Sequence, residues 1–222
     1  MEINPINIFL KPRKTIEKAV SKPDFKIAFL IVLAPTILYA LLNLFSGLGL
    51  DILNTIKHGA ASYFAWIMVS AVIYFFTFMA NSKEAKGKFN GILSAISFAW
   101  LFLAIIMIIS FIVLYSSPKI FAMVTEVRKQ SLSATYAYNI FDENYSATLQ
   151  KHGITDIELS DFSTKAILAV MLLFVFLFYM MFIYPFLTIK QVAKTTYLKS
   201  LLFYLLSGLL TVPVLLAFLL HL

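Results

Sequence analysis

The chain has 222 residues, of which 61% are apolar, 16% aromatic and only 13% charged. Soluble domains carry about 25% charged residues, so this composition excludes an ordinary soluble protein and indicates an integral membrane protein with several spans. The net charge of +7 does not indicate nucleic-acid binding, because the cations lie in short clusters between apolar runs. The absence of cysteine excludes disulfides, thiol catalysis and thiolate metal ligands.

Residues 1–24 form a polar, basic segment ahead of the first apolar run. Its five cations are Lys11, Arg13, Lys14, Lys18 and Lys22. A helix is predicted from Pro12, because proline suits the first helical turn. Ile16, Ala19 and Val20 fall on one face of this helix, and together with Ile8 and Phe9 they make the segment amphipathic. We expect this amphipathic segment to lie along anionic lipid headgroups or to contact an acidic partner; the alternative is that the cations only fix topology.

Five apolar runs follow and predict a membrane domain over residues 25–222. The predicted spans are 25–45, 60–80, 91–115, 166–189 and 200–220. The third is the clearest: its 25 residues contain no charge, and as a helix they would measure roughly 37 Å against roughly 30 Å of hydrocarbon. Prolines inside spans predict static kinks at Pro35, Pro185 and Pro213, and the alternative is that they mark broken helices of a translocation path.

The cations of the short loops predict the orientation of the chain. Five precede span one, three lie in the second loop and three in the fourth, whereas the first loop has one and the two C-terminal residues none. Cytoplasmic loops are enriched in Lys and Arg, so the N-terminus is predicted inside and the C-terminus outside. The fold class predicted is all-α, a bundle of five transmembrane helices.

The third loop, residues 116–165, is the longest polar stretch and is predicted outside the membrane. A helix is predicted to start at Ser117-Pro118, and a second to run from Asp142 to His152 and stop at Gly153. The sequence TDIELSDF is interpreted as extended chain leading into span four. We expect the loop to cap the outer surface of the bundle, with a binding role as the alternative.

The search for chemistry in the sequence gives negative results. No Asp, Glu, Lys or Arg lies well inside a predicted span, and intramembrane catalysis or ion coupling would need such groups. No HExxH, GxSxG, GxGxxG or P-loop motif occurs, so neither an enzyme nor a metal or cofactor site is predicted. Polar residues within spans are interpreted as hydrogen-bonding between helices or to their own backbones. A polar groove would favour a translocator, and its candidates are Asn43, Ser97, Ser207 and Thr211.

Two stretches resemble the prokaryotic Yip-domain family. The first is the segment before span one, with Phe9, Pro12, Thr15-Ile16 and Pro23. The second is Lys86-Gly87-Lys88-Phe89, which leads into span three through Ser94, Ala95, Phe98 and Ala99. The layout of five spans with an inner N-terminus also resembles this family. The chain departs from it in its long third loop and in Leu101, which stands near the place where many relatives carry a proline.

The resemblance implies a non-enzymatic protein of the cell membrane that organises or shapes the bilayer, or scaffolds partner proteins. The expected partners are anionic lipid headgroups, other proteins or further copies of the chain, and no nucleic acid. A Rab-type GTPase is not expected, because the lysine-rich, arginine-poor composition is typical of a prokaryote. The alternative function is a permease or translocator of small solutes or lipids, acting alone or as a subunit of a larger transporter.

Overall fold

The computed structural model describes residues 5–45, 47, 49–131 and 149–220. Within these ranges the chain is helical and contains no strand. Four helices are long and apolar enough to cross a membrane. They are α3 (Phe25–Phe45), α4 (Ile52–Ala80), α6 (Phe89–Tyr115) and the continuous segment Asp156–Ala193, which comprises α9 (Asp156–Phe178), the π-helix η2 (Tyr179–Ile183) and α10 (Tyr184–Ala193).

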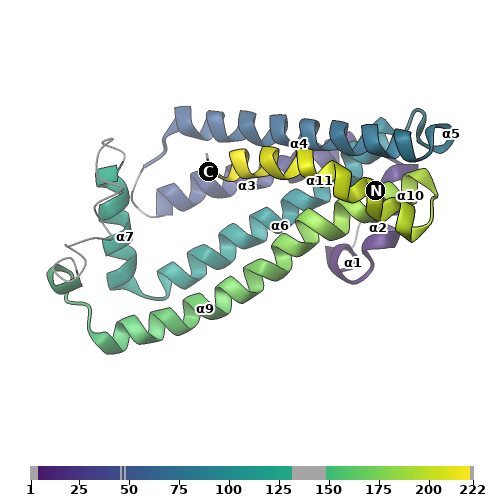
Figure 1. The fold of residues 1–222 in the computed structure, drawn as a ribbon. Helices are drawn as coiled ribbons and strands as arrows, with labels where there is room; N and C mark the ends of the chain where they lie inside the picture. The colour runs from purple at the N-terminus through teal and green to yellow at the C-terminus, as the bar shows by residue number, and fades with distance from the viewer. Residues whose placement is uncertain (1–4, 46, 48, 132–148, 221–222) are drawn as a thin grey trace.

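The long helices lie side by side and alternate in direction (Figure 1). A fifth helix, α11 (Tyr197–Leu220), runs back from the end of α10 and packs against α4 and α10. At the centre, α6 contacts α3, α4, α9 and α10. Helix α6 carries no charged side chain, and its first half is buried among these helices.

Two predicted loops are shorter than the sequence indicated. Helix α4 begins at Ile52 instead of residue 60, because the Asp51 side chain accepts a hydrogen bond from the backbone N–H of Asn54 at 2.9 Å and caps the helix. Gly59, read as part of a connector, lies inside α4, where a Cβ would be 3.4 Å from Thr36 of α3. The connection between α10 and α11 covers only residues 194–196.

The prediction of extended chain before span four is wrong. Helix α9 starts at Asp156 with a capping box: the Thr155 hydroxyl accepts from the Glu158 N–H at 3.3 Å, and the Glu158 carboxylate accepts from the Thr155 N–H at 2.9 Å. Helix α7 (Pro118–Ser131) begins at the predicted proline and crosses the far end of the bundle (Figure 1).

Of the second predicted loop helix, residues 142–148 lie outside the described residues. Residues 149–151 are helical, and the chain turns at Gly153 with φ +59°. The backbone N–H of Ile154 donates to the Leu149 carbonyl at 3.0 Å, which closes the helix end. The predicted glycine stop is confirmed.

Two prolines each leave a backbone carbonyl without the N–H that would donate to it in a helix. In both cases a tyrosine hydroxyl from another helix donates to that carbonyl instead. Pro12 has no N–H for the carbonyl of Ile8, four residues earlier, which accepts instead from the Tyr184 hydroxyl at 2.9 Å. Pro185 likewise cannot donate to the carbonyl of Met181, which accepts from the Tyr204 hydroxyl at 3.1 Å. Since unsatisfied carbonyls are costly in an apolar surrounding, these pairs stabilise the backbone ahead of Pro12 and Pro185. Pro185 lies in the first turn of α10, directly after η2, and π-helical turns are a common cause of helix bending.

The centre of the core is closed by a hydrogen-bond chain that joins three helices. The indole N–H of Trp100 on α6 donates to the Ser62 hydroxyl on α4 at 2.8 Å, and this hydroxyl donates to the Val32 carbonyl on α3 at 3.2 Å. Ser62 and Trp100 are both buried. The α3–α4–α6 packing is therefore specified by polar contacts as well as by apolar fit.

Candidate functional site: the basic end of the bundle

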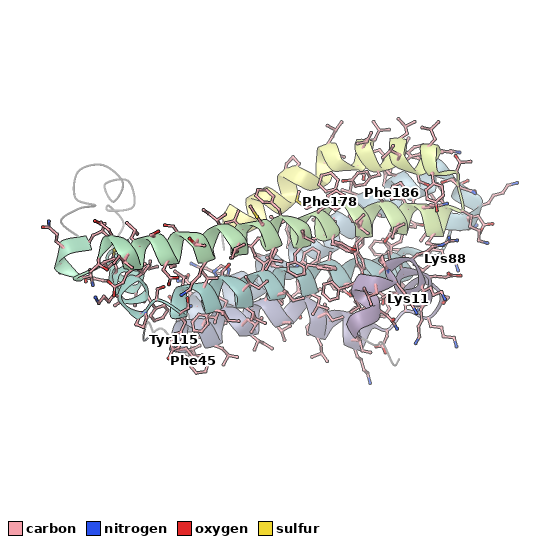
Figure 2. All side chains as sticks on the ribbon, turned by 90° about the horizontal axis from the view of Figure 1, so that it is seen from below. Lys11, Phe45, Lys88, Tyr115, Phe178 and Phe186 are labelled. Atoms are coloured by element: carbon pink, nitrogen blue, oxygen red, sulfur yellow. The ribbon has the colours of Figure 1, made fainter. Side chains whose placement is uncertain are left out.

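One end of the bundle collects most of the positive charge, and we call it the basic end. It is formed by α1 (Pro5–Leu10), α2 (Pro12–Ser21), α5 (Ser82–Ala85), the starts of α3, α6 and α11, and the end of α10 (Figure 1). Twelve of the 18 Lys and Arg residues lie there: Lys11, Arg13, Lys14, Lys18, Lys22, Lys26, Lys83, Lys86, Lys88, Lys190, Lys194 and Lys199. Lys11 and Lys88 lie at this end in Figure 2, and Phe45 and Tyr115 at the other.

The predicted amphipathic helix exists, but its apolar face is buried in protein. Helix α2 starts at Pro12 as predicted and packs against α6 and α10. Ile16 and Ala19 are fully buried, and Ile8 of α1 is 3% exposed. Phe9 packs edge-on against Phe102, with ring centroids 5.0 Å apart. Ile8, Ile16 and Ala19 therefore pack inside the protein, and the expectation that the segment lies along lipid headgroups stays a prediction.

Gly91 allows α2 to approach α6 closely. A Cβ at this position would lie 2.7 Å from the carbonyl oxygen and 2.8 Å from the Cα of Val20. Both atoms belong to the backbone, so they cannot move aside as a flexible side chain could. Glycine at residue 91 is thus required by the crossing of the two helices.

The five predicted contact residues lie together on the outer side of this docked segment. All five are exposed: Lys11, Arg13, Lys14, Lys18 and Lys22. Burial of the opposite face fixes the helix in rotation, so its cations are presented to the surroundings as a set. The structure adds Lys83, Lys86 and Lys88 from the α4–α6 connection to the same end.

A cleft of about 340 Å³ opens at the basic end, and the sequence did not indicate it. It is lined by Glu17, Val20, Ser21, Glu84, Lys88, Gln191, Val192 and Lys194. Its residues come from α2, α5, the residue before α6, and the end of α10. No local motif could have revealed it, because the lining exists only once these distant segments meet.

The turn after α10 is held in place at the edge of this cleft. Lys194 adopts the left-handed conformation with φ +48°, and its Nζ lies 2.9 Å from the Glu84 carboxylate. The side-chain amide of Asn81 donates to the Ala193 carbonyl at 2.9 Å and so satisfies the end of α10. These contacts fix the position of α10 relative to α5.

Most hydroxyl groups within the long helices are satisfied internally. Ser97, Thr188 and Ser207 are buried and donate to carbonyls of their own helices, at 2.7–2.8 Å. Asn43 is also buried, whereas the side chain of Thr211 lies outside the described residues. The hydroxyl of Ser70 has no hydrogen-bond partner within the described chain. The interpretation of in-span polar groups as internal hydrogen-bonding groups is confirmed for the three hydroxyls named first.

Among the described residues no group of three or more His, Asp or Glu side chains is placed to hold a metal ion. Comparison of the chain with protein-family models, with curated proteins and with solved structures finds no match. The resemblance to the Yip-domain family therefore stays a prediction that rests on the two short stretches of sequence.

Proposed function

We propose that this protein is a non-enzymatic, Yip-like integral membrane protein of the cell membrane that organises the bilayer or scaffolds partner proteins through its basic end. In this proposal α11 is the fifth span, the basic end faces the cytoplasm and α7 lies outside. The observation that carries the proposal is the docking of α2: it holds five exposed cations in a fixed arrangement at one end of the apolar bundle.

The distribution of charge supports the proposed orientation. The short connections at the basic end are rich in lysine, and the alternating direction of the helices brings them all to one side (Figure 1). Each cation close to an anionic leaflet contributes about 1 kcal/mol of attraction, so a cluster of five provides substantial affinity for acidic headgroups or an acidic protein surface.

The interior of the bundle supports a scaffold more than a translocator. Ser97 and Ser207, two candidates for a polar groove, are fully buried and hydrogen-bonded to their own helices. Asn43, the most polar candidate, is 4% exposed. A translocation path would instead present such side chains to water.

The topology can be tested directly, because the natural chain has no cysteine to remove. Single cysteines at Lys86 and Thr196 should react with a membrane-impermeant maleimide only after the cells are permeabilised. Cysteines at the exposed residues Ser116 and Gln150 should react in intact cells. Reaction of Ser116→Cys and Lys86→Cys from the same side would disprove the proposed five-span arrangement.

The proposed role of the basic end has to be tested with the full-length protein. An isolated N-terminal peptide would expose Ile16 and Ala19, which are buried in the intact chain, and would bind lipid for that reason alone. We expect donor-labelled protein in mixed vesicles to show more energy transfer to labelled anionic lipid than to labelled zwitterionic lipid. Reversing the charge of Lys11, Arg13, Lys14, Lys18 and Lys22 to Glu should abolish this preference.

Lys57→Glu is the matched control, since Lys57 is exposed and lies on α4 near the opposite end of the bundle. Its preference for anionic lipid should equal that of the natural protein. If the variant with five charge reversals keeps its preference for anionic lipid, the proposed contact between this segment and lipid is refuted. Partner proteins would then be the ligands to test.

A further inference from the structure

The cleft at the basic end contains charges of both signs that the proposed function does not use. Helix α2 contributes Glu17 and Ser21, the residue before α6 is Lys88, and α10 contributes Gln191. Its volume of about 340 Å³ lies in the range of small-molecule sites. The cleft is therefore large enough for a small polar ligand.

Two of the four charges in the cleft neutralise each other. The Nζ of Lys194 and the carboxylate of Glu84 form an ion pair at 2.9 Å, which also holds the end of α10. Glu17 and Lys88 make no ion pair with any other residue in the described part of the chain. The cleft thus offers one carboxylate and one ammonium group, with the Ser21 hydroxyl and the Gln191 amide beside them.

A ligand complementary to these groups carries an ammonium and an anionic oxygen a few bonds apart. A carboxylate accepts hydrogen bonds from a primary ammonium, whereas a quaternary ammonium has no hydrogen to donate. A lysine ammonium is a good donor to phosphate oxygens, and such charge-assisted bonds are stronger than neutral ones. A phosphoethanolamine group meets these requirements, as do smaller soluble zwitterions.

The position of the cleft favours a lipid over a soluble zwitterion. Its lining includes the residue before α6 and the last turn of α10, where the apolar helices end. This is the depth at which phospholipid headgroups lie around a membrane protein. A headgroup can enter here while its acyl chains stay beside the exposed apolar surface of the bundle.

We propose that this cleft binds the headgroup of an aminophospholipid. Glu17 accepts hydrogen bonds from the lipid ammonium, and Lys88 donates to the phosphate. The proposal rests on the proposed function only in that the bundle spans a membrane with the basic end at its surface. None of the five cations tested above lines the cleft, so loss of their lipid preference and loss of headgroup binding in the cleft are separate outcomes.

The test measures lipid binding to the full-length protein in detergent by native mass spectrometry. The probes are phosphatidylethanolamine, phosphatidylcholine and phosphatidylglycerol with identical acyl chains. We expect phosphatidylethanolamine to bind more tightly than phosphatidylcholine. Glu17→Gln should lower the affinity for phosphatidylethanolamine about fivefold and remove its preference over phosphatidylcholine. The affinity for phosphatidylglycerol should not change. Lys88→Gln should lower the affinities for phosphatidylethanolamine and phosphatidylglycerol to the same degree. Lys88→Arg should leave both affinities unchanged.

Lys86→Gln is the matched control, because Lys86 is an exposed neighbour of Lys88 that does not line the cleft. Its lipid binding should be unchanged. Free phosphoethanolamine, added as a competitor, should not displace the lipid; displacement by the free headgroup would identify a soluble zwitterion as the ligand and overturn the lipid assignment. Equal binding of the three lipids, or a preference that survives both Glu17→Gln and Lys88→Gln, would overturn the site itself.

Discussion

The two ends of the bundle are held together by different forces. At the basic end, α2 is fixed by apolar side chains and by backbone contact at Gly91, and its cations face outward. At the far end, α7 is joined to the segment that follows it by partly exposed polar groups: Lys119 lies 2.9 Å from Glu158, and Glu126 pairs with Lys151 and His152. The position of α2 thus depends mainly on apolar packing, and that of α7 depends more on ion pairs.

This difference predicts how each end responds to its surroundings. Packing of apolar groups is insensitive to moderate salt and pH, whereas exposed ion pairs are screened by salt and contribute little individually. The basic end should therefore keep its shape under conditions that loosen the far end. Substitutions that break the packing of α2 should have the largest effects on stability.

The largest effect is expected from Gly91→Leu. Its Cβ would overlap the backbone of Val20, so α2 must move away from α6, at a cost of about 3 kcal/mol. We expect a lower midpoint of thermal unfolding in detergent. We also expect trypsin to cleave faster at the basic residues within 11–22. Gly208→Ala is the control, because a Cβ there meets nothing within 4 Å and alanine favours the helix. A stable Gly91→Leu variant would show that α2 is not docked as described.

A smaller effect is expected from Tyr184→Phe. This change removes the hydroxyl that donates to the Ile8 carbonyl and leaves a buried acceptor unsatisfied ahead of Pro12, which costs about 1–3 kcal/mol. Amide hydrogen exchange should become faster in α1 and α2 and stay unchanged in α7. Tyr197→Phe is the control, since residue Tyr197 is 59% exposed and its ring lies under Lys190. Equal exchange in the two variants would argue against the tyrosine–carbonyl contact.

The smallest effect is expected at the far end and depends on pH. The hydrogen bond from Lys151, and then the charges of Lys151 and His152, hold the pKa of the Glu126 carboxyl below its ordinary value of 4.5. A lowered folded-state pKa contributes stability above the unfolded-state value, and this contribution is lost as the pH falls through the folded-state pKa. The protection factor of the α7 amides, which is the intrinsic exchange rate divided by the measured rate at the same pH, should therefore stay high above pH 4.5 and fall below it.

Glu126→Gln removes the titrating group and provides the check on this prediction. In this variant the protection factor of α7 at pH 7 should be as low as that of the natural protein in acid, and the fall below pH 4.5 should disappear. High salt should mimic the substitution in the natural protein, because the Lys151–Glu126 pair is open to solvent. A fall of the same size in Glu126→Gln would place the acid sensitivity elsewhere.

Local patterns predicted some helix ends and missed others. Pro12, Ser117-Pro118 and the stop at Gly153 all act through neighbouring backbone groups, so they could be recognised along the chain. The starts of α4 and α9 were missed although their capping residues, Asp51 and Thr155, are also local. Residues 46–59, with Lys57, Asp51 and glycines, were interpreted as a short connector and TDIELSDF as extended chain, whereas the two caps start helices there.

The sequence by itself determined that the protein is helical and apolar enough to cross a membrane, because length and hydropathy depend only on the order of residues. It determined the amphipathic pattern of α2, but only the tertiary structure decided what covers the apolar face. Lipid and protein interior are equally apolar, so Ile16 and Ala19 suit either surrounding. The cleft between Glu17 and Lys88 was likewise decided by the tertiary structure, because its walls come from segments that only folding brings together.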